Sequence, residues 1–309
     1  MYRKSTHHGV SRKGFAARAA LAVALASGIA LGGAALSTPA FAKDKEAKPE
    51  GNSKAFVDAY TPFQTIINNP AGDFASARAM VPTIQASIQN ATDKDVFGKA
   101  LIALGDKLKD DGLEKQGIQL ALDSGKATPA QAGIFHFFLG KFDYDAKNYV
   151  EARAQFQAAQ QAGYTENDPR PAIAETYFGA GQAAEGLKYL ADVIKQDQAA
   201  GKKVPDEWML RGLKAAYEAK LAPQATEYTA ILVHNDPTPQ NWHAGLQVVQ
   251  AIGQFDAQSE LDLLRLMRAT GALKDHSDYV EYVQAADPRR MASEVLAVLD
   301  EGVKAGVIN

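Results

Sequence analysis

Residues 133–166 read GIFHFFLGKFDYDAKNYVEARAQFQAAQQAGYTE, and this stretch decides the fold. In its second half, Ala152, Phe156 and Ala159 follow the i, i+4, i+7 spacing of one helix face. Runs of alternating β-branched residues, which are typical of strands, are few anywhere in the chain. The pattern therefore predicts a chain built of helices.

The same order of large and small residues returns with a period of about 34 residues. In the middle unit it comprises Leu139, Gly140, Tyr149, Ala152, Phe156 and Ala159. One period later it comprises Ile173, Ala174, Ala183, Gly186, Leu190 and Val193, and one period earlier Leu104, Gly105, Glu114, Gly117, Ala121 and Ser124. Helix breakers fall between these runs at Asn68-Asn69-Pro70, Thr128-Pro129, Asn167-Asp168-Pro169, Pro205, Asp236-Pro237 and Asp287-Pro288, and the expected helix caps are Asp168, Asp206 and Ser277. Such a period predicts helical hairpins that bury their faces only by stacking on one another.

These positions resemble the tetratricopeptide repeat, whose pattern is W-x2-L-G-x2-Y, then A-x3-F and a later Pro. The best match is residues 133–166, where Leu139-Gly140 supplies L-G and Ala152 with Phe156 supplies A-x3-F. The departures in this unit are His136 for the Trp, Asp143 for the first Tyr and Tyr164 for the Pro. The resemblance covers about 250 residues and weakens at both ends, so a related helical repeat is the alternative. It implies an all-α, right-handed superhelical α-solenoid of about seven helical hairpins with divergent ends.

The first 42 residues are typical of an export signal. A basic start (Arg3, Lys4, Arg12, Lys13 and Arg18) precedes an apolar stretch over 20–36, and Ala40-Phe41-Ala42 matches the A-x-A cleavage pattern. We expect export by the general secretory route and cleavage after Ala42. The twin-arginine route is an alternative, because residues 11–15 resemble its motif with Lys13 for the second arginine, and a retained membrane helix is another. Residues 43–53 are charged and contain Pro and Gly, which predicts a flexible linker, and the repeat domain is expected over 54–309.

The chain without its signal is acidic. Of 33 Lys and Arg, five lie in residues 1–42, which leaves 28 against 36 Asp and Glu and a formal charge of −8. This charge, without a Lys/Arg cluster after residue 43, argues against nucleic-acid binding. The absence of cysteine excludes disulfides, thiolate metal sites and a cysteine nucleophile. An exported chain of this composition fits the bacterial periplasm, with membrane contact only through the signal segment before cleavage.

Motifs for catalysis and cofactor binding do not occur in the sequence. H-E-x-x-H, G-x-S-x-G and G-x-G-x-x-G are all missing. The histidines after residue 42 are His136, His234, His243 and His276, and no two of them lie three or four residues apart. A metal site would therefore need residues from distant units. We expect no metal site, no cofactor and no enzymatic activity.

In the repeat family that the sequence resembles, the first helix of each unit lines a concave groove that receives segments of partner proteins. Carrying that position onto this sequence gives the groove residues Phe137, Lys141, Tyr144, Glu175, Phe178, Trp208 and Arg211. Exposed aromatics and arginines are the residue types that dominate binding hot spots. The alternative is that several of these side chains only pack between helices, because residues 134–144 hold more aromatics than one face can present.

The expected function is that of an exported, non-catalytic scaffold that binds a protein or peptide in this groove. A role in cell-envelope assembly or secretion follows by analogy with the fold and the compartment. The alternatives are a cell-wall-modifying or other hydrolytic enzyme built on an α-helical superhelix, and a solenoid that only self-assembles. A separate catalytic domain would need residues that the repeats already occupy.

Overall fold

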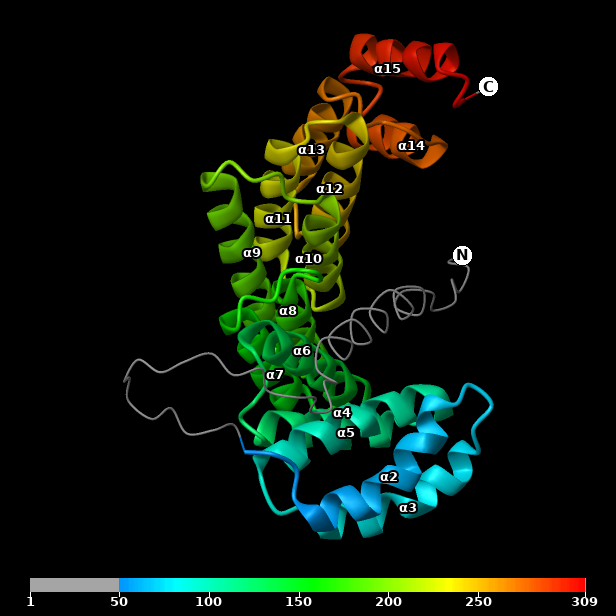
Figure 1. Ribbon diagram of the computed structural model, residues 1–309. Coiled ribbons are helices and arrows are strands. Elements are labelled where there is room, and N and C mark those ends of the chain that lie inside the picture. The colour runs from blue at the N-terminus through cyan, green and yellow to red at the C-terminus, as the bar shows by residue number, and fades with distance from the viewer. Residues whose placement is uncertain (1–49, 309) are drawn as a thin grey trace. The chain divides into compact units, whose positions relative to one another are not determined.

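The structure, a computed structural model, describes residues 50–308. The predicted export signal, its cleavage point after Ala42 and residues 43–49 of the predicted linker lie outside the described residues. Every regular element in residues 50–308 is a helix, which confirms the all-α prediction (Figure 1). None of the helices in this range combines the length and the apolar character that crossing a membrane requires.

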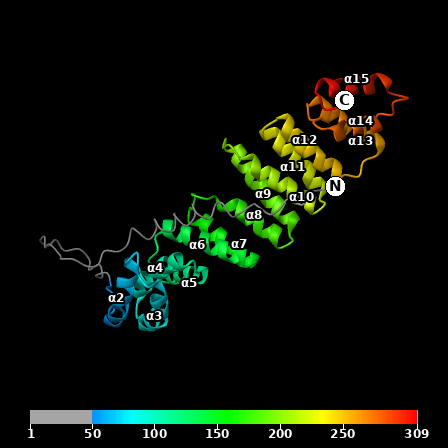
Figure 2. The ribbon, with the colours of Figure 1, turned by 90° about the vertical axis from the view of Figure 1, so that its right-hand side faces the viewer.

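Fourteen helices follow one another in residues 50–308, and the sequence divides into two units after Pro169. The first unit contains α2 (Lys54–Asn68), α3 (Phe74–Ser87), α4 (Ala91–Leu108), α5 (Asp111–Asp123), α6 (Pro129–Asp145) and α7 (Tyr149–Gln161). The second contains α8 (Pro169–Gly179), which starts at the boundary, α9 (Ala183–Ala199), α10 (Asp206–Glu218), α11 (Ala222–Asn235), α12 (Pro239–Ile252), α13 (Ala257–Ala269), α14 (His276–Ala285) and α15 (Ala292–Lys304). Within each unit, helices adjacent in sequence pack side by side, as Figure 2 shows for α4 with α5 and for α11 with α12. The seven helical hairpins agree with the predicted number, while the right-handed superhelical path stays a prediction.

The helix ends follow the predicted breakers. Thr128 caps α6 in a reciprocal capping box with Gln131, and Pro129 occupies the first turn, where its missing N–H costs nothing. Two predicted caps are wrong. Asp206 is the first residue of α10, and its carboxylate accepts hydrogen bonds from Asn235 and Asn241 instead. Asp275, rather than Ser277, caps α14, because Asp275 completes a capping box with the residue three positions on.

The start of the described chain is fastened to α4. Thr92 Oγ1 donates to the carbonyl of Glu50 at 2.6 Å, and Asn90 Nδ2 donates to the carbonyl of Gly51 at 3.0 Å. The fully buried carboxylate of Asp93 accepts from the Ser53 backbone N–H at 3.0 Å and from Ser53 Oγ at 2.7 Å. Residues 50–53, the last part of the predicted linker, are therefore held in place, and the starts of α2 and α4 lie together.

Aromatic side chains and a close approach of the α4 and α5 backbones form the core of the first unit. The rings of Phe56 and Phe63 on α2 form T-shaped pairs with the ring of Phe97 on α4, with centroids 6.4 Å and 5.9 Å apart. Further along, α4 and α5 cross at Gly98 and Gly117, where a Cβ on either residue would fall within 2.7 Å of the other's carbonyl oxygen. Only glycine allows two helices to approach this closely. This crossing includes Gly117, a small position of the sequence repeat.

Candidate functional site

The structure places the predicted groove residues of α6 unequally. Phe137 is only 8% exposed, and its ring centroid lies 5.6 Å from that of Phe156 and 4.9 Å from that of Tyr164. Phe137 therefore belongs to the core and offers almost no surface to a partner. Lys141 and Tyr144 are half-buried, and Tyr144 meets the edge of Tyr149 at 5.4 Å. Part of the surface of each of these two side chains on α6 is therefore exposed to solvent.

In the second unit, three of the four predicted residues come together. The Arg211 guanidinium binds Glu175 through two contacts, Nε to Oε1 at 2.6 Å and Nη2 to Oε2 at 2.7 Å. The same guanidinium stacks over the Phe178 ring at 4.8 Å. Trp208 lies instead under the guanidinium of Arg170, at 5.5 Å. The charge of Arg211 is thus already matched, so a partner that bound here would have to compete with Glu175.

Another groove lies between α2 and α4 of the first unit. This cavity, here called the α2–α4 groove, has a volume of about 680 Å³. The side chains before and along α2 that line it are Asn52, Phe56, Val57, Tyr60, Thr61, Gln64, Ile67 and Asn68. The opposite wall consists of Thr92, Asp95, Val96, Lys99, Ala100, Ala103 and Lys107 on α4, together with Lys126 between α5 and α6. Most of the exposed lining is apolar, which suits a site that desolvates its ligand.

The geometry of the two helices gives the groove its length. Ser53 and Asp93 join the starts of α2 and α4, and the lining residues of both helices extend to their last turns. At 1.5 Å per residue, the lined part of α4 from Thr92 to Lys107 spans about 22 Å. Six or seven residues of extended chain, at about 3.3 Å each, fill that length.

Charge distinguishes the α2–α4 groove from the chain as a whole. Lys99 binds Asp95 at 2.8 Å, and both side chains are largely buried. Lys107 lies over the Phe74 ring at 4.7 Å, and Lys126 is exposed. Three lysines against one carboxylate give the groove a positive charge, although the full chain is formally −3.

Sequence reasoning missed this groove because the repeat pattern is weak in the first helices of the domain. The buried face of α2 carries Phe56, Phe63 and Ile67, which is a visible helical pattern. The groove, however, also uses positions beside that face, such as the 43% exposed Val57, and small residues on α4, such as Ala103. An exposed apolar side chain that faces small residues on another helix indicates a groove, but this pattern can be recognised only when it is known that α2 packs beside α4.

One group of side chains in residues 50–308 has the spacing of a metal site. The ligand atoms of His243, Asp275 and Asp278 all lie within 4.8 Å of one another. However, His243 Nδ1 is 2.8 Å from the carbonyl of Ala272, and Asp278 Oδ2 accepts from the backbone N–H groups of Lys274 and Asp275. These carboxylates thus cap α14, and the histidine ring hydrogen-bonds to the backbone.

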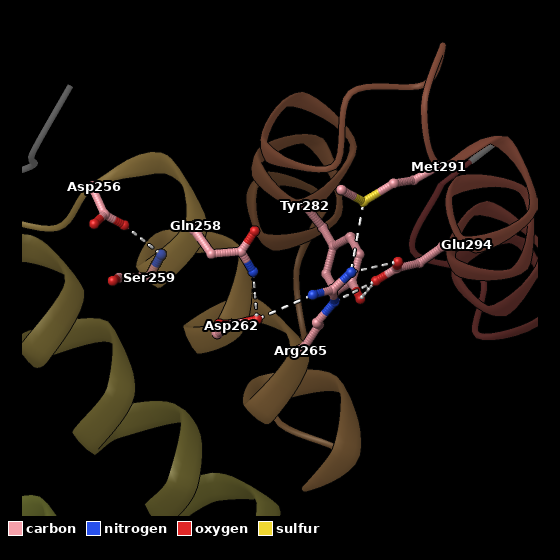
Figure 3. Close-up of polar contacts among 8 residues, drawn as sticks. All are labelled: Asp256, Gln258, Ser259, Asp262, Arg265, Tyr282, Met291 and Glu294. Carbon is pink, nitrogen blue, oxygen red and sulfur yellow. Dashed lines mark hydrogen bonds and ion pairs between the residues drawn. The ribbon is translucent and has the colours of Figure 1, made fainter.

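A dense polar cluster connects α13 to α15. Arg265 donates from Nε and Nη2 to the carboxylate of Glu294, both at 2.8 Å, and from Nη1 to Asp262 at 3.0 Å (Figure 3). The Tyr282 hydroxyl donates to the same carboxylate at 2.7 Å, and Met291 Sδ lies 3.6 Å from Arg265 Nη2 (Figure 3). Hydrogen bonds, first from Arg265 and then from Tyr282, lower the pKa of Glu294 to about 2. Glu294 is thus ionised at neutral pH and does not have the raised pKa of a general acid.

Comparisons with known proteins leave the family open. No protein-family model and no curated protein sequence matches the chain. Among solved structures, one described as "Functional Characterization of Pseudomonas Aeruginosa pilF" is similar over 75% of this chain and 96% of that chain, with 13% sequence identity and a TM-score of 0.35. A similarity at this level carries no argument about the function of this chain.

Proposed function

We propose that the chain is an exported, non-catalytic scaffold that binds a segment of a partner protein in the α2–α4 groove. The observation that carries this proposal is the groove itself, a mostly apolar groove of about 680 Å³ between α2 and α4. The helical-repeat architecture supports it, because the first helices of successive hairpins pack side by side at α2 with α4 in the first unit and at α10 with α12 in the second. The acidic composition and the predicted signal support export to the periplasm, where envelope assembly or secretion is the expected setting.

The polar clusters of the described residues favour binding over chemistry. The carboxylates of Glu294 and Glu301 are both bound by arginines, and the carboxylates beside His243 cap a helix. Glu294 and Glu301 line a hollow of about 640 Å³, but arginines bind both carboxylates, so neither is the unoccupied acid or base that hydrolysis would require. A scaffold therefore accounts for these residues better than the hydrolytic alternative does.

The test compares two matched substitutions on the protein lacking its signal, residues 43–309. Val57→Glu places a carboxylate in the groove wall, whereas Val150→Glu makes the same change at a 68% exposed valine on α7. Both variants are first shown to be folded, and each is then used for affinity capture from detergent-solubilised cell envelopes beside the parent. We expect a partner that the parent and Val150→Glu retain and that Val57→Glu loses.

Other results would count against the groove. If all three proteins capture the same partner, binding lies outside the α2–α4 groove. A Tyr144→Ala variant then shows whether the half-buried aromatics of α6 form the site. Turnover of a cell-wall substrate by the purified parent would overturn the non-catalytic part of the proposal.

A further inference from the structure

Two lysines that line the α2–α4 groove can pair with a ligand. Lys107 and Lys126 are both exposed, and neither has a carboxylate within ion-pair distance among the described residues. The third lysine of the lining, Lys99, is already bound by Asp95, the only carboxylate there. Lys107 contacts the Phe74 ring through a cation–π interaction, which leaves its positive charge unneutralised. The groove therefore presents two uncompensated positive charges.

These two lysines lie toward opposite ends of the groove. Lys107 is in the last turn of α4. A connection of only two residues joins α4 to α5, so the two helices run antiparallel, and a Cβ on Gly98 would lie 2.7 Å from the backbone of Ala121 near the end of α5. Lys126 follows three residues after α5 ends and so lies beside the start of α4. A ligand that lies along the groove therefore meets one lysine near each end.

Between the two lysines the groove wall is mostly apolar. Val57 from α2 and Val96 with Ala103 from α4 belong to this wall, and Val57 is 43% exposed. An apolar side chain that covers this wall removes it from water, whereas a polar one would lose its own hydration without a hydrogen bond in return. The pattern that fits the groove is therefore apolar in the middle and negative toward both ends.

Three other kinds of occupant match this pattern less well. A basic segment would face like charges, and residues 1–42 of this chain contain five Lys and Arg and no carboxylate. An acyl anion has an apolar chain with one charged end, so it would leave one of the two lysines unpaired. A neutral apolar segment would fill the middle of the groove but would gain nothing from either lysine.

We propose that the α2–α4 groove binds an extended segment of a partner protein in which a run of apolar side chains is flanked on both sides by Asp or Glu. This inference rests on the proposed function and specifies the chemistry of its partner. Lys107 binds the carboxylate at one end and Lys126 the carboxylate at the other, while the apolar side chains pack on Val57 and Val96. The groove length of about 22 Å places the two carboxylates about six or seven residues apart.

The probe is a library of random 12-residue peptides displayed on phage and selected against residues 43–309. Peptides retained by the parent and by Val150→Glu but lost on Val57→Glu are kept as groove-dependent. We expect these peptides to carry Asp or Glu on both sides of an apolar run. Their affinity for the parent should fall as sodium chloride is raised from about 50 to about 500 mM, because salt screens ion pairs at exposed lysines.

A double-mutant cycle assigns the peptide carboxylates to the two lysines. Replacing each peptide Asp by Asn, or Glu by Gln, should weaken binding to the parent by about two- to fivefold, the range of an exposed ion pair. In Lys107→Gln/Lys126→Gln the same replacements should change binding by less than about 1.5-fold. The control Lys147→Gln/Lys304→Gln removes two exposed lysines outside the groove lining and should keep the full losses. The single variants then show which carboxylate each lysine binds.

The outcomes separate the two proposals. Groove-dependent peptides without flanking acids, or with carboxylate effects that persist in Lys107→Gln/Lys126→Gln, overturn the acidic-segment inference and leave the groove as the binding site. Decanoate below its micellar concentration should not displace the peptides; displacement would assign the groove to an acyl anion and overturn both proposals. If no peptide depends on Val57, the proposed function fails and the inference fails with it.

Discussion

Tyr228 on α11 packs its ring directly against Gly212 on α10, where a Cβ on residue 212 would overlap the ring. Tyr228 is fully buried, and its hydroxyl donates to the carbonyl of Leu187 at 2.7 Å. The first unit repeats this relationship, because a Cβ on Gly140 would lie 2.7 Å from Phe156 Cδ1. In both hairpins the glycine precedes the aromatic by 16 residues. The recurrence shows that one packing rule builds hairpins in both units.

Replacing Gly212 with alanine should lower the free energy of unfolding by about 3 kcal/mol. The added methyl group overpacks a site that Tyr228 fills, and the hydroxyl bond of Tyr228 restricts how far the ring can move. Urea unfolding followed by circular dichroism measures the change. Gly112→Ala is the control, since a Cβ at that helical position meets only the tip of the Asp110 side chain and should change stability by less than about 1 kcal/mol. Equal stabilities of the two variants would contradict the packing argument.

Phe137→Ala should destabilise the fold by about 3 to 5 kcal/mol, whereas Tyr144→Ala should cost about 1 kcal/mol. Phe137 is buried against Phe156 and Tyr164, so its removal leaves a cavity. Tyr144 is half-buried, and its ring forms a T-shaped pair with Tyr149. Chemical denaturation of the two single variants distinguishes these roles. Similar costs for both would mean that Phe137 is not a core residue.

The hairpin architecture could be predicted because it depends on residues that repeat. Gly140 and Phe156 stand at fixed positions in a period that returns along the chain, and breakers such as Thr128-Pro129 mark where helices begin. Local sequence of this kind predicts where each helix lies and also which helix it packs against, because each helix packs against the next one in the sequence.

The binding surface could not be predicted in the same way. Helix α6 carries aromatic residues on several faces. Positions taken over from a repeat family therefore do not show which of these side chains point into the core, as Phe137 does. The α2–α4 groove depends on residues about 40 positions apart, such as Val57 and Val96, that share no motif. Which apolar side chains stay uncovered is decided by packing between hairpins.

Zinc should not stabilise the protein. Three side chains have the spacing of a metal site: His243, Asp275 and Asp278. The two carboxylates already cap the start of α14, and His243 Nδ1 is hydrogen-bonded to the carbonyl of Ala272. A ligand that binds only the folded state raises the melting temperature, so the absence of a shift is informative. Thermal unfolding with and without excess zinc chloride should give the same midpoint within about 1 °C. An increase of several degrees that His243→Gln abolishes would instead establish a metal site.

The contribution of Glu294 to stability should disappear in acid. Hydrogen bonds, above all those from Arg265, lower the pKa of Glu294 from 4.5 to about 2 in the folded protein. The unfolded chain therefore takes up this proton at a higher pH than the folded chain does. The stabilisation is complete above about pH 4.5 and is lost as the pH falls from 4.5 toward 2.

Glu294→Gln removes this titration, so the stability difference between parent and variant should be largest at neutral pH and shrink between pH 4.5 and 2. Urea midpoints at pH 7, 5, 3.5 and 2.5 follow the difference. Asp300→Asn, an exposed carboxylate on the same helix α15, is the control and should differ little from the parent at pH 7. A parent–variant difference that stays constant from pH 7 to 2.5 would show that the hydrogen bonds of Arg265 and Tyr282 do not stabilise the ionised carboxylate in solution. Loss of the difference already above pH 6 would point to a group other than Glu294, because a carboxylate with a lowered pKa does not titrate there.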